Sequence, residues 1–341
     1  MSELSGLYVP ELRLRKGIAV RDSYGRDINY LRISLTDRCN LRCRYCMPED
    51  LSLLPMSKIL TYEEILLICE QAVALGITRF KVTGGEPLVR KGCASFCRSL
   101  RQLPGVEQVT LTTNGVLLEE NLPALVEAGV AAINISLDTL QPERFEQITG
   151  RPYLEQVLRG IRASAAATEI RTKLNVVLQK GWNDDECQTL AELARKHPLD
   201  VRFIEMMPIG FGKETEGISN EEVLRRLRET YGTVTPDDAI HGNGPAVYYR
   251  MPGFAGSIGL ISAMHGKFCG SCNRIRMTST GEVKACLCYE DSHSVREAAR
   301  AGDRAAVRHI LEDVITSKPA EHCFEEWSQI TEKKKMSKIG G

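Results

Sequence analysis

Residues 30–48 read YLRISLTDRCNLRCRYCMP and join a strand pattern to a dense group of cysteines. The alternation over residues 30–35 predicts a short β-strand. That strand leads directly into Cys39, Cys43 and Cys46, which are spaced C-x3-C-x2-C. Three thiolates on one loop can bind one inorganic centre, and soft thiolate ligands favour an iron–sulfur cluster, zinc or copper(I). A structural zinc site needs four closed ligands, whereas a four-iron cluster with three cysteines keeps one iron open.

The order of strand, loop and helix repeats over residues 30–220. We expect strands at 30–35, 78–83, 106–112, 131–137, 173–178 and 201–205, and helices at 61–74, 93–103, 119–128, 142–148, 154–166, 184–196 and 221–229. Such alternation is typical of parallel strands joined by right-handed crossovers, either in an open doubly wound sheet or in a full or partial (β/α) barrel. No G-x-G-x-x-G follows the first strand, which disfavours dinucleotide binding. Polar residues and glycines recur after the strands, at the edge that carries the active site in barrels.

The pattern divides the chain into three parts. Residues 1–28 show no periodicity and are expected to form a flexible N-terminal arm. Residues 29–231 form the predicted barrel. Residues 232–341 form a C-terminal extension, Gly-rich and loop-like over 232–290 and helical over 292–316.

Composition excludes several classes of protein. The chain has 341 residues, with 44 Lys and Arg against 44 Asp and Glu, so its formal net charge is zero. Neutrality argues against a broad nucleic-acid-binding surface but allows a small basic pocket. The sequence has no long apolar run typical of a membrane span, and residues 1–16 lack the apolar segment of a secretory signal. We therefore expect a cytoplasmic protein without a membrane or nucleic-acid partner. The cytosol keeps thiols reduced, so its twelve cysteines are not expected to form disulfides.

A second cysteine group lies in the extension. Cys269 and Cys272 are spaced C-x2-C, and Cys286 follows, with Cys288 as an additional thiol. By spacing alone, a zinc site built from all four is a real alternative to a second iron–sulfur cluster. The remaining cysteines at 69, 93, 97, 187 and 323 are interpreted as small buried apolar residues without a role.

The adjacent arginines suggest anion binding. Arg274 and Arg276 follow the C-x2-C pair directly, and guanidinium groups match phosphate oxygens with two parallel hydrogen bonds.

The first cysteine motif, together with Gly84-Gly85-Glu86-Pro87 one strand–helix unit later, resembles the radical S-adenosylmethionine (SAM) superfamily. The resemblance implies an α/β fold, a partial (β/α)6 barrel. It implies that the first three cysteines hold a [4Fe–4S] cluster whose open iron chelates SAM. One electron then cleaves SAM to methionine and a 5′-deoxyadenosyl radical.

More of the chain resembles one family within that superfamily, the GTP 3′,8-cyclases, or molybdenum cofactor biosynthesis protein A. The resemblance rests on the context of the first motif, on Ile148-Thr149-Gly150-Arg151, on the run from Phe268 to Arg276 with Cys286-Leu287, and on the terminal Gly340-Gly341. It implies a lyase that abstracts the ribose 3′ hydrogen of GTP and forms 3′,8-cyclo-7,8-dihydroguanosine 5′-triphosphate. This is the first step of molybdenum cofactor (molybdopterin) biosynthesis.

The family resemblance also implies a set of site residues. The extension should cover the barrel mouth and hold a second [4Fe–4S] cluster on Cys269, Cys272 and Cys286, whose open iron binds the guanine base. The implied SAM contacts are Tyr45, Gly84, Gly85, Glu86, Ser136 and Met207. The implied GTP contacts are Arg32, Lys81, Thr112, Lys173, Arg274, Ile275 and Arg276. Position 81 is Lys where some members have Arg, which keeps the charge and loses the planar fork. Arg274, Arg276, Gly340 and Gly341 are expected to act in catalysis beside Cys39, Cys43 and Cys46.

The implied partners are GTP, an external one-electron reductant, cyclic pyranopterin monophosphate synthase as the next enzyme, and a second copy in a homodimer. Two alternatives remain at this point. One is a radical SAM enzyme with an auxiliary cluster that modifies a peptide. The other is a non-enzymatic zinc or iron–sulfur protein that uses the same cysteines.

Overall fold

The computed structural model describes residues 20–47, 53–334 and 336–339. Its centre is a set of six parallel strands in sequence order, as the alternating pattern predicted. They are β1 (Tyr30–Ser34), β2 (Arg79–Thr83), β3 (Gln108–Thr113), β4 (Ala132–Ser136), β5 (Arg171–Val177) and β6 (Asp200–Ile204). Each expected strand is confirmed to within a few residues of its predicted bounds.

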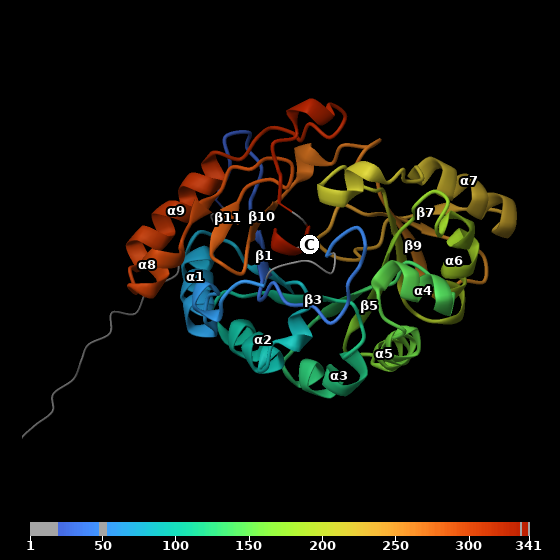
Figure 1. Cartoon of the computed structure of the whole chain (residues 1–341), viewed down its shortest axis with the longest axis horizontal. Helices are drawn as coiled ribbons and strands as arrows, with labels where there is room; N and C mark the ends of the chain where they lie inside the picture. Colours follow the sequence, from blue (N-terminus) through green and yellow to red (C-terminus); the bar gives the residue numbers. More distant parts are fainter. Residues whose placement is uncertain (1–19, 48–52, 335, 340–341) are drawn as a thin grey trace, which may run out of the picture.

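Helices connect these strands and lie on the outer face of the sheet (Figure 1). They are α1 (Tyr62–Ala74), α2 (Cys93–Gln102), α3 (Leu118–Glu127), α4 (Pro142–Thr149), α5 (Leu154–Ala166) and α6 (Cys187–Lys196). The start of α1 shows how local sequence sets these bounds. Thr61 accepts a hydrogen bond from the backbone N–H of Glu64, and the Glu64 carboxylate accepts one from the N–H of Thr61. This reciprocal capping box stabilises a helix by about 1 kcal/mol.

The C-terminal part of the chain extends the sheet at both ends. After α7 (Asn220–Tyr231), the chain forms β7 (Thr235–Asp237), β8 (Val247–Arg250), β9 (Ser257–Ile261), β10 (Arg274–Met277), β11 (Glu282–Lys284) and β12 (His293–Ser294). Strand β9 pairs in parallel with β6, and β10 pairs in parallel with β1. The described sheet therefore runs β12-β11-β10-β1-β2-β3-β4-β5-β6-β9-β8-β7, and its two end strands do not pair with each other. The fold is a partial barrel of the expected class.

The loop-like interpretation of residues 232–290 was wrong. Five strands lie wholly within that range, and two of them flank the six-stranded core. These strands are three to five residues long and lie among glycines, so local pattern gives them little signal. The single helical stretch expected at 292–316 is two helices, α8 (Arg296–Arg300) and α9 (Arg304–Thr316). Gly302, with φ +68°, interrupts them in a left-handed conformation that favours glycine.

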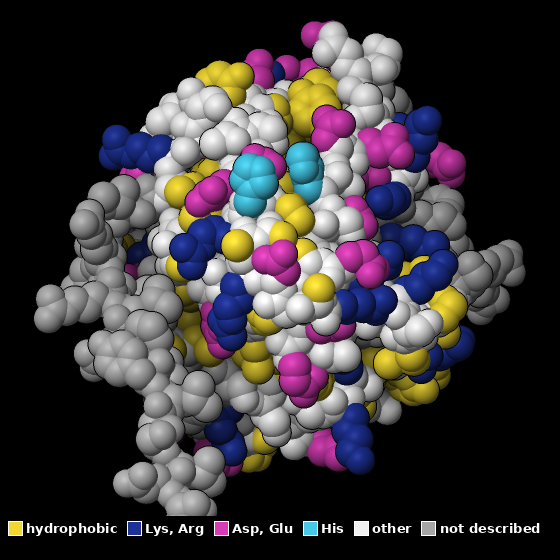
Figure 2. All heavy atoms as spheres, turned by 90° about the vertical axis from the view of Figure 1, so that its left-hand side faces the viewer, with side chains coloured by type: hydrophobic (Ala, Val, Ile, Leu, Met, Phe, Trp, Pro, Cys, Tyr) yellow, Lys and Arg dark blue, Asp and Glu magenta, His cyan; other side chains and the backbone are white. Residues whose placement is uncertain are grey.

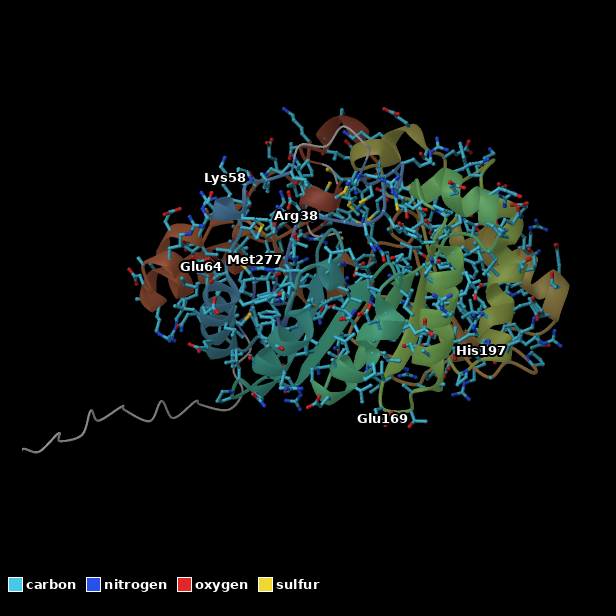
Figure 3. The ribbon with its side chains drawn as sticks, turned by 60° about the horizontal axis from the view of Figure 1, so that its bottom comes forward. Arg38, Lys58, Glu64, Glu169, His197 and Met277 are labelled. Atoms are coloured by element: carbon cyan, nitrogen blue, oxygen red, sulfur yellow. The ribbon has the colours of Figure 1, made fainter. Side chains whose placement is uncertain are left out.

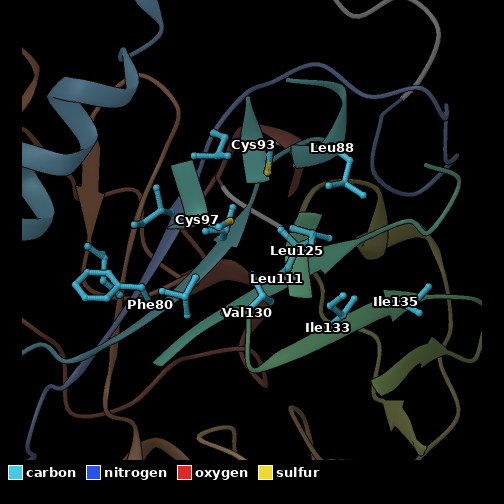
Figure 4. Packing of buried hydrophobic residues seen from close by; sticks show 14 of the residues in the cluster. Phe80, Leu88, Cys93, Cys97, Leu111, Leu125, Val130, Ile133 and Ile135 are labelled. Carbon is cyan, nitrogen blue, oxygen red and sulfur yellow. The ribbon is translucent and has the colours of Figure 1, made fainter. Parts of the chain in front are cut away.

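The main hydrophobic core lies between the sheet and its outer helices. In Figure 4, Phe80 on β2, Leu111 on β3 and Ile133 on β4 pack among apolar residues that include Cys93 and Cys97 of α2. Both cysteines are almost fully buried, as are Cys69 and Cys187. The interpretation of these four as small core residues is consistent with their packing.

The described end of the expected N-terminal arm is tied down. Residues 20–28 begin beside the end of α1, where the N–H of Val20 donates to Leu75 O at 3.0 Å. The buried Arg26 guanidinium donates to three carbonyl oxygens far along the chain, those of Cys269 (2.9 Å), Pro319 (2.6 Å) and Ala320 (2.8 Å). The expectation of a flexible arm therefore fails for residues 20–28, and residues 1–19 lie outside the described part.

All parallel strands end at one edge of the sheet. Figure 3 shows Arg38, which follows β1, near the upper part of the molecule, while Glu169 and His197 precede β5 and β6 at the lower part. The loops after the strands therefore gather on the side of Arg38. This places the first cysteine loop at the edge where sequence patterning predicted an active site.

Basic and acidic side chains are interspersed over the face that carries α8 and α9 (Figure 2). Arg300 pairs with Glu64 at 3.2 Å, and Arg304 pairs with Glu70. Charge on this face is therefore balanced locally. In the described part of the chain, no helix has the length and apolar character needed to span a bilayer.

Candidate active site

A chamber of about 370 Å³ lies at the carboxyl edge of the sheet. Both cysteine groups line it, together with loops that follow five of the six core strands. Its volume falls within the range of roughly 300–1,000 Å³ that is usual for small-molecule sites. The chamber brings together residues more than 200 positions apart in the sequence.

The first cysteine group faces the chamber from the loop after β1. Cys39 accepts hydrogen bonds from the N–H of Leu41 at 3.4 Å and from the Asn114 side chain at 3.6 Å. Burial raises the pKa of Cys39 and raises that of Cys43 still further, because the other two thiols also stand close to Cys43. A bound metal centre relieves this penalty, since it favours the deprotonated thiolate. The donor set thus fits an iron–sulfur cluster.

The loop after β2 fixes the backbone of the cysteine loop. The N–H of Gly85 donates to Thr36 O at 2.7 Å, and the N–H of Glu86 donates to Arg38 O at 2.8 Å. A Cβ added to Gly85 would lie 2.4 Å from Arg38 O, so a side chain at this position does not fit. Gly84 and Gly85 both line the chamber, where they form part of the wall next to the cysteines.

Glu86 connects the loops after β2 and β3. Its carboxylate accepts hydrogen bonds from the N–H of Leu88 (3.0 Å), the Thr113 hydroxyl (2.8 Å) and the N–H of Asn114 (2.7 Å). Burial raises the pKa of Glu86 to about 7, although these donors favour the charged form. The side chain is 1% exposed and does not line the chamber. The structure therefore gives Glu86 loop contacts, and direct contact with SAM stays a prediction.

Tyr45 is oriented by a buried carboxylate. Its hydroxyl donates to Asp138 Oδ2 at 2.6 Å, and Asp138 Oδ1 accepts the N–H of Val177 at 2.9 Å. Burial raises the pKa of Asp138 to about 6. Ser136, at the end of β4, and Met207, after β6, line the same chamber. Asp138 lies just after β4, and the sequence assigned it no function.

The second cysteine group lines the same chamber. Cys269 opens a short 3-10 turn, Cys272 ends it, and Cys286 follows β11. Lys318 donates to Arg274 O at 3.0 Å and to Ala285 O at 2.6 Å, which fixes its ammonium beside this group. Burial opposes ionisation of Cys272, yet Lys318 and Arg274 outweigh it and hold the Cys272 pKa below the usual thiol value. Nothing in the local sequence around Lys318 singled it out.

The described side chains do not gather three His, Cys, Asp or Glu residues tightly enough to hold one metal ion. A four-iron cluster has a different requirement, because each of its three cysteines binds a different iron. The second group does share one chamber wall, and burial raises the pKa of Cys269 with further contributions from Cys286 and Cys272. Three soft ligands around one space fit a cluster of this type.

Strand register aligns basic side chains across the sheet. Arg276 on β10 is the partner of Arg32 on β1, which is in turn the partner of Lys81 on β2. A second row runs across the next four strands. Its members, in order from β3 to β6, are Thr112, Asn134, Lys173 and Asp200. Parallel pairing therefore assembles a basic inner surface from residues that are far apart in the sequence.

Arg202 on β6 joins this basic surface and was missed by sequence reasoning. It is 6% exposed, donates to the Asn175 side chain, and keeps a buried Nε without a hydrogen-bond partner among the described residues. Arg274 Nε is buried in the same way. Buried donors without partners cost free energy, which an anionic ligand would recover.

Burial, together with mutual repulsion, lowers the pKa values of these cations. Burial lowers the pKa of Lys81 well below its usual range, and Arg202, Arg32, Lys173 and Arg274 lower it further. Burial also lowers the pKa of Lys173 to about 7 and that of Arg276 to about 9. The concentration of buried cations on the basic inner surface therefore favours binding of an anion.

Several expected contacts lie outside the chamber wall. Ile275 alternates with its two arginine neighbours on β10, and its side chain packs in the hydrophobic core. Lys81 and Lys173 lie in the same basic surface without lining the chamber. Gly340 and Gly341 lie outside the described residues. Ile339, the last residue described, is fully buried.

Family models match both parts of the chain. A model described as the radical SAM superfamily matches residues 33–194, and one described as Molybdenum Cofactor Synthesis C matches residues 199–324. A relative from Clostridium perfringens, named GTP 3′,8-cyclase, is 41% identical over 324 residues, covering 94% of this chain and all of that protein. The chain belongs to the GTP 3′,8-cyclase family.

Other members of this cyclase family are equally similar. The GTP 3′,8-cyclase of Moorella thermoacetica is 43% identical over 94% of this chain and 100% of its own length. GTP 3′,8-cyclase 2 of Pseudomonas aeruginosa is 42% identical over 94% and 98%. Membership of the radical SAM superfamily identifies the chain as an enzyme that uses a [4Fe–4S] cluster and SAM.

The fold also matches a solved structure. Streptococcus suis SuiB bound to S-adenosylmethionine superposes with a TM-score of 0.57 at 15% sequence identity, over 79% of this chain and 63% of SuiB. This similarity supports the partial barrel of the cyclase.

Proposed function

We propose that this chain converts GTP to 3′,8-cyclo-7,8-dihydroguanosine 5′-triphosphate, the first step of molybdenum cofactor biosynthesis. One observation carries the proposal: two cysteine groups face a single chamber, and buried basic side chains extend from the same space. The family relationship gives the reaction, and the chamber offers a place for a nucleotide between the cysteine groups.

At one end of the chamber, Cys39, Cys43 and Cys46 would hold the SAM-binding cluster. When bound, this cluster and SAM supply the radical that removes the ribose 3′ hydrogen of GTP. The protein orients SAM through the Tyr45 backbone, the Gly84–Gly85 wall, Ser136 and Met207. The Tyr45–Asp138 hydrogen bond fixes the tyrosine. Positioning of this kind replaces acid–base catalysis as the protein's contribution.

At the other end, Cys269, Cys272 and Cys286 would hold a second [4Fe–4S] cluster that binds the guanine base. Lys318 supports this assignment because a fixed cation beside Cys272 favours its thiolate form. Arg26 supports it as well, since its bond to Cys269 O fixes the loop before any ligand binds.

The basic inner surface would bind the triphosphate. A nucleoside triphosphate carries about four negative charges, and a low-dielectric pocket of cations attracts it strongly. Arg32, Lys81, Lys173, Arg274 and Arg276 supply the charge, and Arg202 adds to it. Thr112 and the Ile275 backbone complete the proposed contacts.

The end of the chain would close the site. The buried Ile339 brings the chain to the small apolar cluster of Ile209, Cys288 and Phe324 beside the chamber. We propose that Gly340 and Gly341 enter the active site, where residues without side chains fit.

The reaction also needs an external one-electron reductant, and its product would pass to cyclic pyranopterin monophosphate synthase. We also propose that the enzyme is a homodimer in the cytoplasm.

An anaerobic assay of the reconstituted enzyme tests the proposal. We expect about eight iron atoms per chain, the sum of two four-iron clusters. SAM cleavage to 5′-deoxyadenosine should increase on addition of GTP and yield the cyclised nucleotide, while peptides should have no effect. Stimulation by a peptide instead of GTP would favour the peptide-modifying alternative. Zinc in place of iron would exclude the radical reaction.

A further inference from the structure

Cys288 and Cys323 form a thiol pair next to the three proposed ligands of the second cysteine group. Their sulfur atoms lie 3.0 Å apart, although the residues are 35 positions apart in the sequence. The N–H of Cys323 also donates to Cys288 Sγ at 3.4 Å. Cys323 was interpreted as a residue without a role, and Cys288 as a candidate ligand of the second cluster. The structure instead brings these two thiols together.

The two thiols differ in access. Cys288 is fully buried in the small apolar cluster that contains Ile209, Phe324 and Ile330. Cys323 lies at the margin of this cluster and is only partly buried. A reactant from solvent therefore meets Cys323 first, and Cys288 stands behind it. One partly accessible and one shielded thiol is the arrangement of an attacking and a resolving cysteine.

Two further contacts fix the segment of Cys288 relative to the tail that carries Cys323. The N–H of Glu332 donates to Cys288 O at 3.2 Å, and Glu332 forms an ion pair with Lys284. Glu332 thus joins the tail that carries Cys323 to both Lys284 and Cys288. A disulfide needs sulfur atoms at about 2.05 Å, so closure requires a shift of roughly 1 Å.

We propose that Cys288 and Cys323 are a redox-active dithiol that exchanges with low-molecular-weight disulfides of the glutathione class. The Cys323 thiolate attacks one sulfur of the reactant and releases one thiol, which leaves a mixed disulfide. Cys288 then attacks the Cys323 sulfur, and the second thiol leaves. The protein dithiol loses two electrons and two protons, and the reactant disulfide gains them as two thiols.

The cross-link would join two segments whose neighbouring residues line the chamber. Cys288 follows Cys286 of the second group by two residues, and Cys323 lies between His322 and Phe324, which both line the chamber. Oxidation would therefore fix the tail against the loop that holds the proposed second cluster. This thiol chemistry goes beyond the proposed function and does not depend on GTP turnover.

The test uses the full-length, cluster-loaded enzyme, kept anaerobic and titrated with oxidised glutathione. Peptide mapping by mass spectrometry should find one new cross-link, between the peptides of Cys288 and Cys323, with the loss of two hydrogen atoms. Iron content should not change. Cys323→Ala and Cys288→Ala should each abolish the cross-link, whereas the buried core variant Cys69→Ala should retain it.

Two results would overturn the proposal. The first is glutathione bound stably to Cys323 in the native enzyme without a cross-link to Cys288. The second is the loss of iron, or of the second cluster's electron paramagnetic resonance signal, in folded Cys288→Ala, because Cys288 would then be a cluster ligand. Mapping of the native enzyme alone decides the question if a variant fails to fold.

Discussion

Lys284 and Glu332 form a salt bridge in which both side chains are fully buried. Lys284 ends β11, and its ammonium also donates to Glu290 O at 3.0 Å. Glu332 lies in the C-terminal tail and accepts the N–H of Lys334 at 2.7 Å. The pair attaches the tail to the sheet beside the second cysteine group. Its other polar contacts satisfy both charges away from water.

Glu332→Ala should therefore destabilise the enzyme by about 3–5 kcal/mol, because it leaves Lys284 buried without its counter-charge. Urea unfolding of the variant and of wild type measures the difference. Glu325→Gln is the matched control, since Glu325 pairs with Lys267 at the exposed surface, and its midpoint should hardly move. Equal midpoints for Glu332→Ala and the control would contradict the anchoring role.

Arg274→Ala should weaken GTP binding by roughly tenfold to a hundredfold, the loss of one to two charge-assisted hydrogen bonds. SAM cleavage without GTP should continue, because the substitution does not alter the first cysteine group. Equilibrium binding of GTP and release of 5′-deoxyadenosine measure the two effects separately. Arg98→Ala, on the outer helix α2, is a control that should leave both unchanged. Unaltered GTP affinity in Arg274→Ala would refute a phosphate contact.

GTP binding should take up protons near pH 8. Lys173 has a pKa of about 7, so it is mostly neutral in the free enzyme at this pH, and burial lowers the pKa of Lys81 as well. A triphosphate favours their charged forms and raises both pKa values. Calorimetric titration in two buffers with different ionisation enthalpies gives the number of protons taken up. Lys173→Met should reduce that number, and the absence of any uptake in wild type would contradict the placement of the triphosphate.

The Glu86 carboxyl should give the apoprotein a measurable pH dependence. Its pKa is raised from 4.5 to about 7, so the folded protein holds this proton more tightly than the unfolded chain does. The resulting stabilisation is complete below the unfolded pKa and is lost as pH rises through about 7. The free energy of unfolding of wild type relative to Glu86→Gln should therefore fall between about pH 5 and pH 8. A difference that does not vary with pH would exclude the shifted carboxyl as its source.

Deletion of Gly340 and Gly341 should abolish cyclisation and leave the fold intact. Ile339 stays in place in the apolar cluster beside the chamber, so the shortened chain keeps its buried anchor. Circular dichroism should match wild type, and SAM binding should persist. Normal turnover by the shortened enzyme would show that its terminal glycines have no part in the reaction.

Much of the fold was predictable because its signals are local. The helix that begins after Thr61 and the alternating strand after Asn29 depend on neighbours a few residues away, and both are found where expected. The two cysteine motifs are equally local. Their meeting in one chamber followed from the family resemblance and from the rule that parallel strands end together.

The missed residues act through distant contacts. Strand β10 is four residues long, and only its pairing with β1 makes it a strand. No local motif surrounds Arg26, Arg202 or Lys318. Their roles depend on carbonyl groups, cations or thiols from other parts of the chain. A single sequence does not show which distant residues are neighbours in the fold, so these contacts are identified only from the three-dimensional structure.

The pairing of β1 between β2 and β10 has a consequence for synthesis of the enzyme. The partner of one edge of β1 is β2, which is synthesised some fifty residues later. The partner of the other edge is β10, which is synthesised only when the ribosome reaches Arg274. Through most of translation, that edge presents unpaired backbone groups to other chains. The carbonyls of Pro319 and Ala320 that receive Arg26 emerge later still. A nascent or truncated chain therefore lacks both a closed sheet edge and a fixed second cysteine loop.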